Sequence, residues 1–296
     1  MRAGGLSALA LVLGAAACVW GFGWDDALAR WALDGQREVQ GAMAAAVRAL
    51  RAGEPGALAS LAAIAYSYGV FHAVGPGHGK VLIAGYGVAS AVRLLRLSAI
   101  ALGASLAQAL SAILLVVVGA RLLGLGRAEL TGIAEDWLAP ASWAAIAGVG
   151  LWLALRGLLG LQRAARGGEA HAHSGCGHAH GPSSDEVQRA EGLSDVLVLV
   201  ASIAVRPCTG ALFLLILTFA IGAPMAGILG ALAMGLGTAT VTIAAGAAAV
   251  LLRDGAFLPA TGRAAARIMP VLAIGAGLMI ATVSAGLFVQ SLRYAL

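Results

Sequence analysis

Long stretches without charge limit this chain more than any other sequence feature. No Asp, Glu, Lys or Arg occurs between Glu54 and Lys80, and none occurs between Arg206 and Arg253. About 20 apolar residues cross a bilayer as a helix, so each stretch can hold one span or more. Of the 296 residues, 60% are hydrophobic and only 11% are charged, which exceeds what a water-soluble domain can bury. We therefore expect an all-α polytopic membrane protein.

The apolar segments predict about seven transmembrane helices. Six fall within 57–92, 97–120, 137–155, 196–252 (two spans that turn at Gly222-Ala223-Pro224) and 268–292. The first helix is expected at 6–22. Its end at Ala15-Ala16-Ala17 also resembles a signal-peptide cleavage site, so a signal segment at 1–22 stays an alternative. Residues 23–56 place apolar side chains at helical spacing among charges, which predicts an amphipathic helix on the periplasmic surface or over the core. A plain connecting segment is the alternative.

The first of these six spans contains a break. Phe71-His72-Ala73-Val74-Gly75-Pro76-Gly77-His78-Gly79-Lys80 brings two imidazoles and the only lysine into an apolar segment. Pro76 lacks an amide hydrogen, and Gly75 and Gly77 free the backbone from helical geometry. Ionisable groups at membrane depth are costly and usually mark a site or a pathway.

The spacing of His72 and His78 links the break to metal binding. Six residues apart on an unbroken helix, they would point about 240° away from each other, at roughly 100° per residue. They can hold one ion only if the helix is interrupted between them, where Gly75-Pro76-Gly77 lies. Imidazole suits Ni²⁺, Co²⁺ and Zn²⁺. A kinked helix with two packed histidines is the alternative.

A second break lies in the span that begins at Val196, at Arg206-Pro207-Cys208-Thr209-Gly210. Each half of the six-helix core, 57–161 and 193–296, then has three spans, of which the first is broken. Paired interruptions of this kind predict a 3+3 inverted repeat with its site near the midplane. Cys208 would then face the His72/His78 break. Arg206 and Pro207 are expected to act as pathway or hinge residues, as are Gly75, Pro76, Gly77 and Lys80.

The loop at 162–192 between the two halves is rich in histidine. His171, His173, Cys176, His178 and His180 lie within ten residues, a plausible accessory binder of soft metals. The spacing does not match a closed zinc site. A linker with incidental histidines is the alternative. Cys18, Cys176 and Cys208 form no CxxC pair, so they predict no disulfide framework.

A few polar residues lie within otherwise apolar spans. Ser105, Gln108 and Ser111 recur every three residues, and Thr238 and Thr242 share a helix face. We count Gln108, Thr238 and Thr242 as candidate pathway residues, although such groups more often bond a neighbouring helix. In a membrane protein, the distribution of arginine and lysine indicates which loops face the cytoplasm, so the net positive charge does not indicate nucleic-acid binding. This distribution favours a cytoplasmic N-terminus and histidine-rich loop, with the C-terminus outside.

The two breaks carry a family resemblance. His72-Ala73-Val74-Gly75-Pro76-Gly77-His78-Gly79-Lys80 resembles the signature of the NicO/RcnA-type nickel and cobalt transporters, and Ser202–Ala211 is its second motif. The similarity extends over about residues 57–290. It implies a multi-pass protein of the bacterial inner membrane that moves Ni²⁺ or Co²⁺, with Zn²⁺ for some relatives. Export is slightly favoured over uptake, and a periplasmic metal-binding partner can take part.

Other functions fit the sequence less well. A transmembrane thiol-disulfide electron carrier of the DsbD/CcdA type is the main alternative, but it needs two thiols that can meet, and the first break has no cysteine. Gly77-His78-Gly79-Lys80 departs from the spacing of a nucleotide-binding P-loop. A metal sensor without transport would not need broken helices in both halves. We expect no enzyme and no cofactor besides the transported ion.

Overall fold

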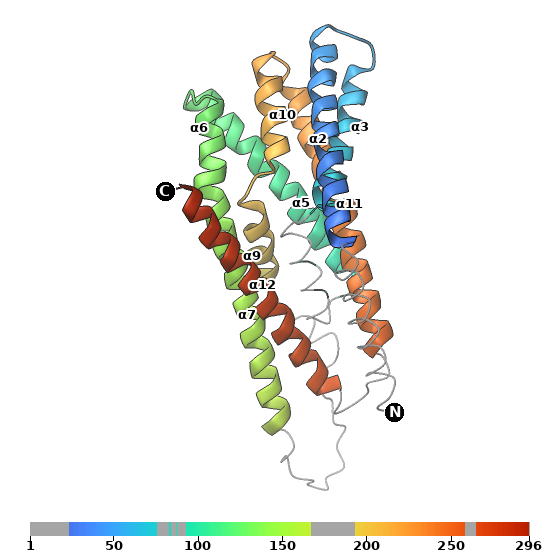
Figure 1. The fold of residues 1–296 in the computed structure, drawn as a ribbon, viewed down its shortest axis with the longest axis vertical. Coiled ribbons are helices and arrows are strands. Elements are labelled where there is room, and N and C mark those ends of the chain that lie inside the picture. Colours follow the sequence, from blue (N-terminus) through green and yellow to red (C-terminus); the bar gives the residue numbers. More distant parts are fainter. Residues whose placement is uncertain are drawn as a thin grey trace.

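The computed structural model describes residues 24–75, 83, 87, 93–166, 193–257 and 265–295. Within these ranges the chain is helical and forms no strand (Figure 1). Five helical stretches are long and apolar enough to cross a membrane, and a bent helix pair adds a sixth. The all-α polytopic class is therefore confirmed, and these six spans match the six expected for the two halves. The helix expected at 6–22 lies outside the described residues.

The first half contains three of these spans. After α2 (Trp24–Arg51), which precedes this half, its helices are α3 (Ala57–Val74), α5 (Leu94–Val116), α6 (Arg127–Gly132) and α7 (Ala139–Arg166), with π-helical turns η1 (Val117–Leu122) and η2 (Ile133–Leu138). α5 runs on into η1, and α6 and η2 run on into α7, so these segments form two continuous spans. The first span, α3, ends one residue before Gly75, where the sequence predicts the break to begin.

The second half begins with the bent pair. α9 (Leu193–Ala204) and α10 (Thr209–Ala220) are bent by 58° at the predicted second break. Pro207 explains the interruption, because its ring removes a backbone donor and clashes with the preceding turn. α11 (Pro224–Phe257) and α12 (Ala265–Ala295) follow. The predicted turn between α10 and α11 is confirmed, with Gly222 at a φ of 78° and Pro224 as the first helical residue.

α2 is the helix that the alternation of charge and apolar residues in 23–56 predicts. It lies lengthwise beside α3, and a short turn with Gly53 and Gly56 in the left-handed region joins the two (Figure 1). Met43 and Val47 are buried, whereas Asp34 and Arg37 form an exposed ion pair of 3.4 Å. The helix is therefore amphipathic, and its expected place at the periplasmic surface stays a prediction.

Helices of each half pack against helices of the other half. α3, the first span of its half, packs on α11, the second span of the other half. In return, α5 packs on α9 and α10, and the third spans α7 and α12 pack on each other. Figure 1 shows the α2–α3 and α10–α11 turns at the same end, so α3 and α10 run in opposite directions. An inverted repeat requires corresponding spans to run in opposite directions, although the repeat itself stays a prediction.

Small residues allow α7 and α12 to approach closely. A Cβ atom added to Gly150 would lie 2.6 Å from the backbone nitrogen of Ala281, and one on Gly277 would lie 2.5 Å from that of Ala154. Because backbone atoms cannot rotate away, neither position can hold a larger residue without moving a helix. Such glycine contacts are a common way for helices to associate in lipid, where side-chain packing replaces the hydrophobic effect.

We expect Gly277→Ala and Gly150→Ala to destabilise the protein by about 1–3 kcal/mol, the usual cost of overpacking. Gly275→Ala and Gly148→Ala are matched controls on the same two helices, because a Cβ atom there meets nothing within 4 Å. Thermal unfolding in detergent measures the difference. Equal melting temperatures for Gly277→Ala and Gly275→Ala would contradict the close packing of α7 on α12.

Candidate functional site

His72 lies in the last turn of α3, at the start of the first break. The helix ends at Val74, and Gly75 leaves helical geometry with φ −58° and ψ 167°. A residue before proline is disfavoured in the α region, so Pro76 in the sequence accounts for this end. His72 is half-buried. The first break therefore leaves an imidazole at a helix end inside the helix bundle.

Cys208 lies in the second break, as the residue that precedes α10. Its backbone is extended, with φ −70° and ψ 126°, and the residue is only 7% exposed. The thiol makes no side-chain cap bond by strict geometry, but the backbone amides of Gly210 and Ala211 in the first turn of α10 interact with its sulfur. Helix N-termini favour negative charge. The second break therefore presents a buried sulfur at the start of α10.

The fold brings these two residues together. The imidazole of His72 lies close enough to the thiol of Cys208 to interact with it. One comes from each broken span, and the sequence predicts that the two breaks face each other. An imidazole and a thiol in contact can serve as two ligands of one transition-metal ion, since both are ligands of such metals.

Tyr68 forms one wall of this pair. Its ring stacks on His72, with centroids 6.0 Å apart and an interplanar angle of 10°. Its hydroxyl accepts a hydrogen bond of 3.0 Å from Nε2 of Gln36 on α2, and it also bonds the side chain of Thr209. Gly210 lies against the ring, where any Cβ atom would overlap it. Tyr68 therefore connects His72 with α2 and with the start of α10.

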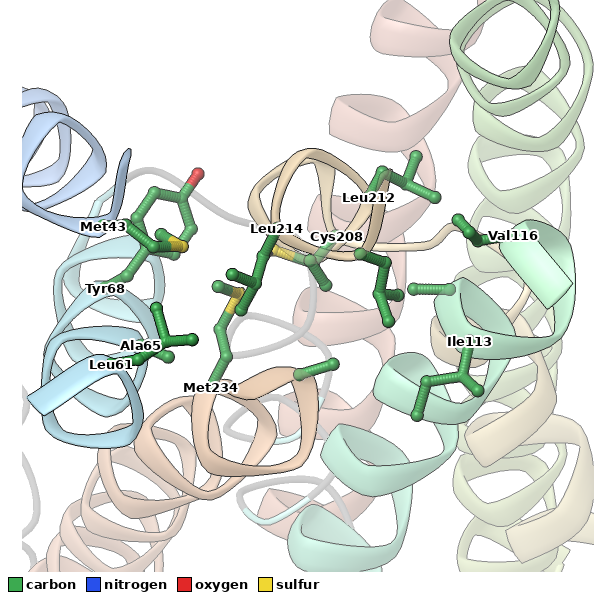
Figure 2. Packing of buried hydrophobic residues seen from close by; sticks show 14 of the residues in the cluster. Met43, Leu61, Ala65, Tyr68, Ile113, Val116, Cys208, Leu212, Leu214 and Met234 are labelled. Atoms are coloured by element: carbon green, nitrogen blue, oxygen red, sulfur yellow. Dashed lines mark hydrogen bonds between the residues drawn. The ribbon is translucent and has the colours of Figure 1, made fainter. Parts of the chain in front are cut away.

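Met234, on α11, lies beside Cys208. Its Sδ atom is 3.7 Å from Cys208 Sγ, and the residue is 1% exposed (Figure 2). Sequence analysis misses Met234, Tyr68 and Gln36. A methionine or tyrosine in an apolar span has no spacing that separates it from core packing, and Gln36 lies in a segment expected to cover the surface.

Gln108 and Arg206 stabilise the backbone of the second break. Nε2 of Gln108 donates a 3.0 Å hydrogen bond to the carbonyl oxygen of Arg206. The Arg206 guanidinium lies 3.5 Å from Glu135 and 5.4 Å from the centre of the Trp143 ring. That Arg206 and Pro207 act as pathway or hinge residues stays a prediction. A role for Gln108 in a pathway stays a prediction.

Thr238 and Thr242 bond backbone carbonyls. The Thr238 hydroxyl lies 3.1 Å from the carbonyl oxygen of Met234 and 3.3 Å from that of Gly69 on α3, and Thr242 donates to the carbonyl of Thr238 at 2.8 Å. Thr238 thus joins α3 to α11 next to the turn that carries His72. That either hydroxyl lines a pathway stays a prediction.

A small cavity with both polar and apolar lining residues lies next to this cluster. Its volume is about 170 Å³, and residues of α2, α6 and α10 line it, among them Gln40, Thr131 and Thr209. Thr209 follows Cys208 in the chain and bonds Tyr68. The cavity therefore reaches the cluster on the side of Thr209.

Other predicted site residues lie outside the described residues: Pro76, Gly77, His78, Lys80, and the loop residues His171, His173, Cys176, His178 and His180. Within the described ranges, no three residues of the types His, Cys, Asp and Glu form a group that could hold a metal. The described part of the site therefore consists of His72, Cys208, Met234 and Tyr68.

Comparison with known proteins gives two matches. Residues 58–175 match the NicO family, described as high-affinity nickel-transport protein. A protein of Haemophilus influenzae named "Putative nickel/cobalt efflux system" is 29% identical over 193 residues, which cover 58% of this chain and 60% of that protein. The chain thus matches less than two thirds of this relative's length. No solved structure matches.

Both matches agree with the resemblance carried by the two motifs. The family match includes the whole first break and ends inside the histidine-rich loop. The resemblance predicted from the sequence is confirmed, because residues 58–175 are similar to the NicO nickel-transport proteins.

Proposed function

We propose that this protein carries divalent nickel or cobalt ions across the bacterial inner membrane, with export favoured over uptake. The observation that carries the proposal is the contact between His72 and Cys208, which joins one break to the other inside an apolar helix bundle. The family match and the name of the Haemophilus influenzae protein support the choice of metal, and that name also supports export. Zinc remains a candidate cargo, since it binds the same donors.

The arrangement supplies what transport of such an ion requires. An ion that leaves water must exchange its hydration shell for ligands, and His72 and Cys208 offer two within a buried region. Transporters often place their sites at broken helices near the midplane and move one half against the other. Here the ligands come from different halves, so relative movement of the halves changes their separation. The ion can then be bound in one arrangement and released in another.

The first prediction concerns the imidazoles. His72→Ala should abolish nickel and cobalt flux, because the variant removes a donor that contacts Cys208. His78→Ala should do the same if both sides of the first break supply ligands. Ser67→Ala on the same helix is the control, since that hydroxyl is exposed and donates to the carbonyl of Ala63 within α3. Radioactive nickel flux into proteoliposomes is the measurement, and near-normal flux in His72→Ala would refute the proposal.

The second prediction concerns the histidine-rich loop, which we place in the cytoplasm. Deletion of residues 171–180 should shift the apparent metal affinity and leave a measurable maximal flux. The reason is that a chelating loop outside the bilayer raises the local ion concentration but provides no path through the bilayer. Flux measured over a range of nickel concentrations separates the two parameters. A loss as complete as in His72→Ala would show that the loop contains the essential ligands.

The third prediction separates transport from thiol-disulfide electron transfer. Cys208→Ser should retain partial flux with an altered metal preference, because a hydroxyl is a poorer ligand for these ions than a thiolate. In an electron carrier the same change would remove the reacting sulfur. Nickel flux and the redox state of periplasmic thiols should be followed together in cells. Unchanged flux with oxidised periplasmic thiols would favour the electron carrier.

A further inference from the structure

We propose that the thioether of Met234 is a third metal donor and sets the preference of the site for soft and borderline ions. The inference rests on the proposed transport function and adds a donor that neither motif contains. Met234 belongs to α11, between the second break and the final span. The site then combines an imidazole, a thiolate and a thioether from three separate segments.

The separation of the two sulfur atoms suits a shared metal ion. Two ligands of a tetrahedral ion at metal–sulfur distances of about 2.3 Å lie about 3.8 Å apart. Cys208 Sγ and Met234 Sδ are 3.7 Å apart. An ion could therefore bind both atoms with little change in their separation. Figure 2 shows the two sulfur atoms next to each other between α10 and α11.

The backbone of α11 holds Met234 in place. A Cβ atom on Gly69 would overlap the Met234 carbonyl, so α3 and α11 touch at this residue. The Thr238 hydroxyl bonds the same carbonyl oxygen at 3.1 Å and the Gly69 carbonyl at 3.3 Å. α3 also carries His72, one turn further along. The contact between the helices therefore fixes the Met234 backbone relative to the turn of α3 that carries His72.

The chemistry of these donors predicts selectivity. Thioether and thiolate sulfur are soft ligands, whereas Mg²⁺, Ca²⁺ and Mn²⁺ favour oxygen. The thioether also adds no charge, so it can be buried at low cost when no ion is bound. A flexible methionine can adjust its sulfur as the halves move. Met234 is thus suited to distinguish nickel and cobalt from the abundant hard cations.

Met234→Leu tests this role, and Met43→Leu is its matched control. Both residues are buried in the same hydrophobic cluster, and replacement of methionine by leucine nearly conserves volume. We expect Met234→Leu to weaken Ni²⁺ binding to the purified full chain about 10- to 100-fold, the range seen when groups that support a metal site are lost. Met43→Leu should bind as the wild type does. Competition flux should show a similar fall in the ratio of nickel to manganese transport.

Selenomethionine labelling gives a direct structural readout. X-ray absorption at the nickel edge should show a nickel–selenium shell in the labelled wild type and in Met43→Leu, and none in Met234→Leu. A labelled wild type that binds nickel through sulfur and nitrogen without a selenium shell would overturn the inference, even if Met234→Leu fails to fold. The transport proposal would survive that result. Wild-type protein that neither binds nor transports nickel would instead refute the proposed function.

Discussion

Backbone amide and carbonyl groups that lie away from water need hydrogen-bond partners, and this requirement governs the structure. In hydrocarbon, every unpaired amide or carbonyl costs several kcal/mol, so a broken helix is tolerated only where protein or a polar cavity surrounds it. The second break meets this condition through Gln108, which bonds the carbonyl of Arg206 at 3.0 Å from a neighbouring span. Because such a break must be enclosed by protein, the second break lies in the interior. A chemically useful site can form there because backbone and side chains are already held in place.

Small residues decide how closely the enclosing helices can come. Gly69 lies against the backbone of α11, Gly237 lies against the carbonyl of Tyr66, and Gly210 lies against the ring of Tyr68. Any larger residue at these positions would separate α3 from α10 or α11. The contact between His72 and Cys208 depends on that separation, since each residue is held by a different helix. The abundance of glycine in the sequence therefore bears on the site as well as on the packing.

The sequence predicts the class of fold, the six described spans and both helix breaks, because proline, glycine and charge leave strong signals in apolar segments. It also predicts that Cys208 faces the first break, and the structure places it against His72. It does not predict Met234 or Tyr68, because apolar and aromatic residues in a span look alike whether they pack or bind, and it does not predict Gln36, which lies in a segment expected to cover the surface. Gln108 and Thr238 were expected to line a pathway or bond a neighbour, and the contacts seen are bonds to backbone carbonyls of neighbouring segments. Which residues meet depends on helix crossings, and these follow from three-dimensional packing.

The turn between α2 and α3 has a mechanical consequence. Gly53 and Gly56 adopt left-handed backbone geometry, and only a few residues separate the helices, which then pack along each other. Gln36 on α2 is bonded to Tyr68 on α3, and Trp31 lies 5.1 Å from the ring of Phe71. α2 and α3 are thus connected at two places, by the turn and by the contacts of Gln36 and Trp31, so the two helices form one rigid unit. Any displacement of the segment bearing His72 must carry α2 with it, so a force applied to α2 from outside would be transmitted to the imidazole.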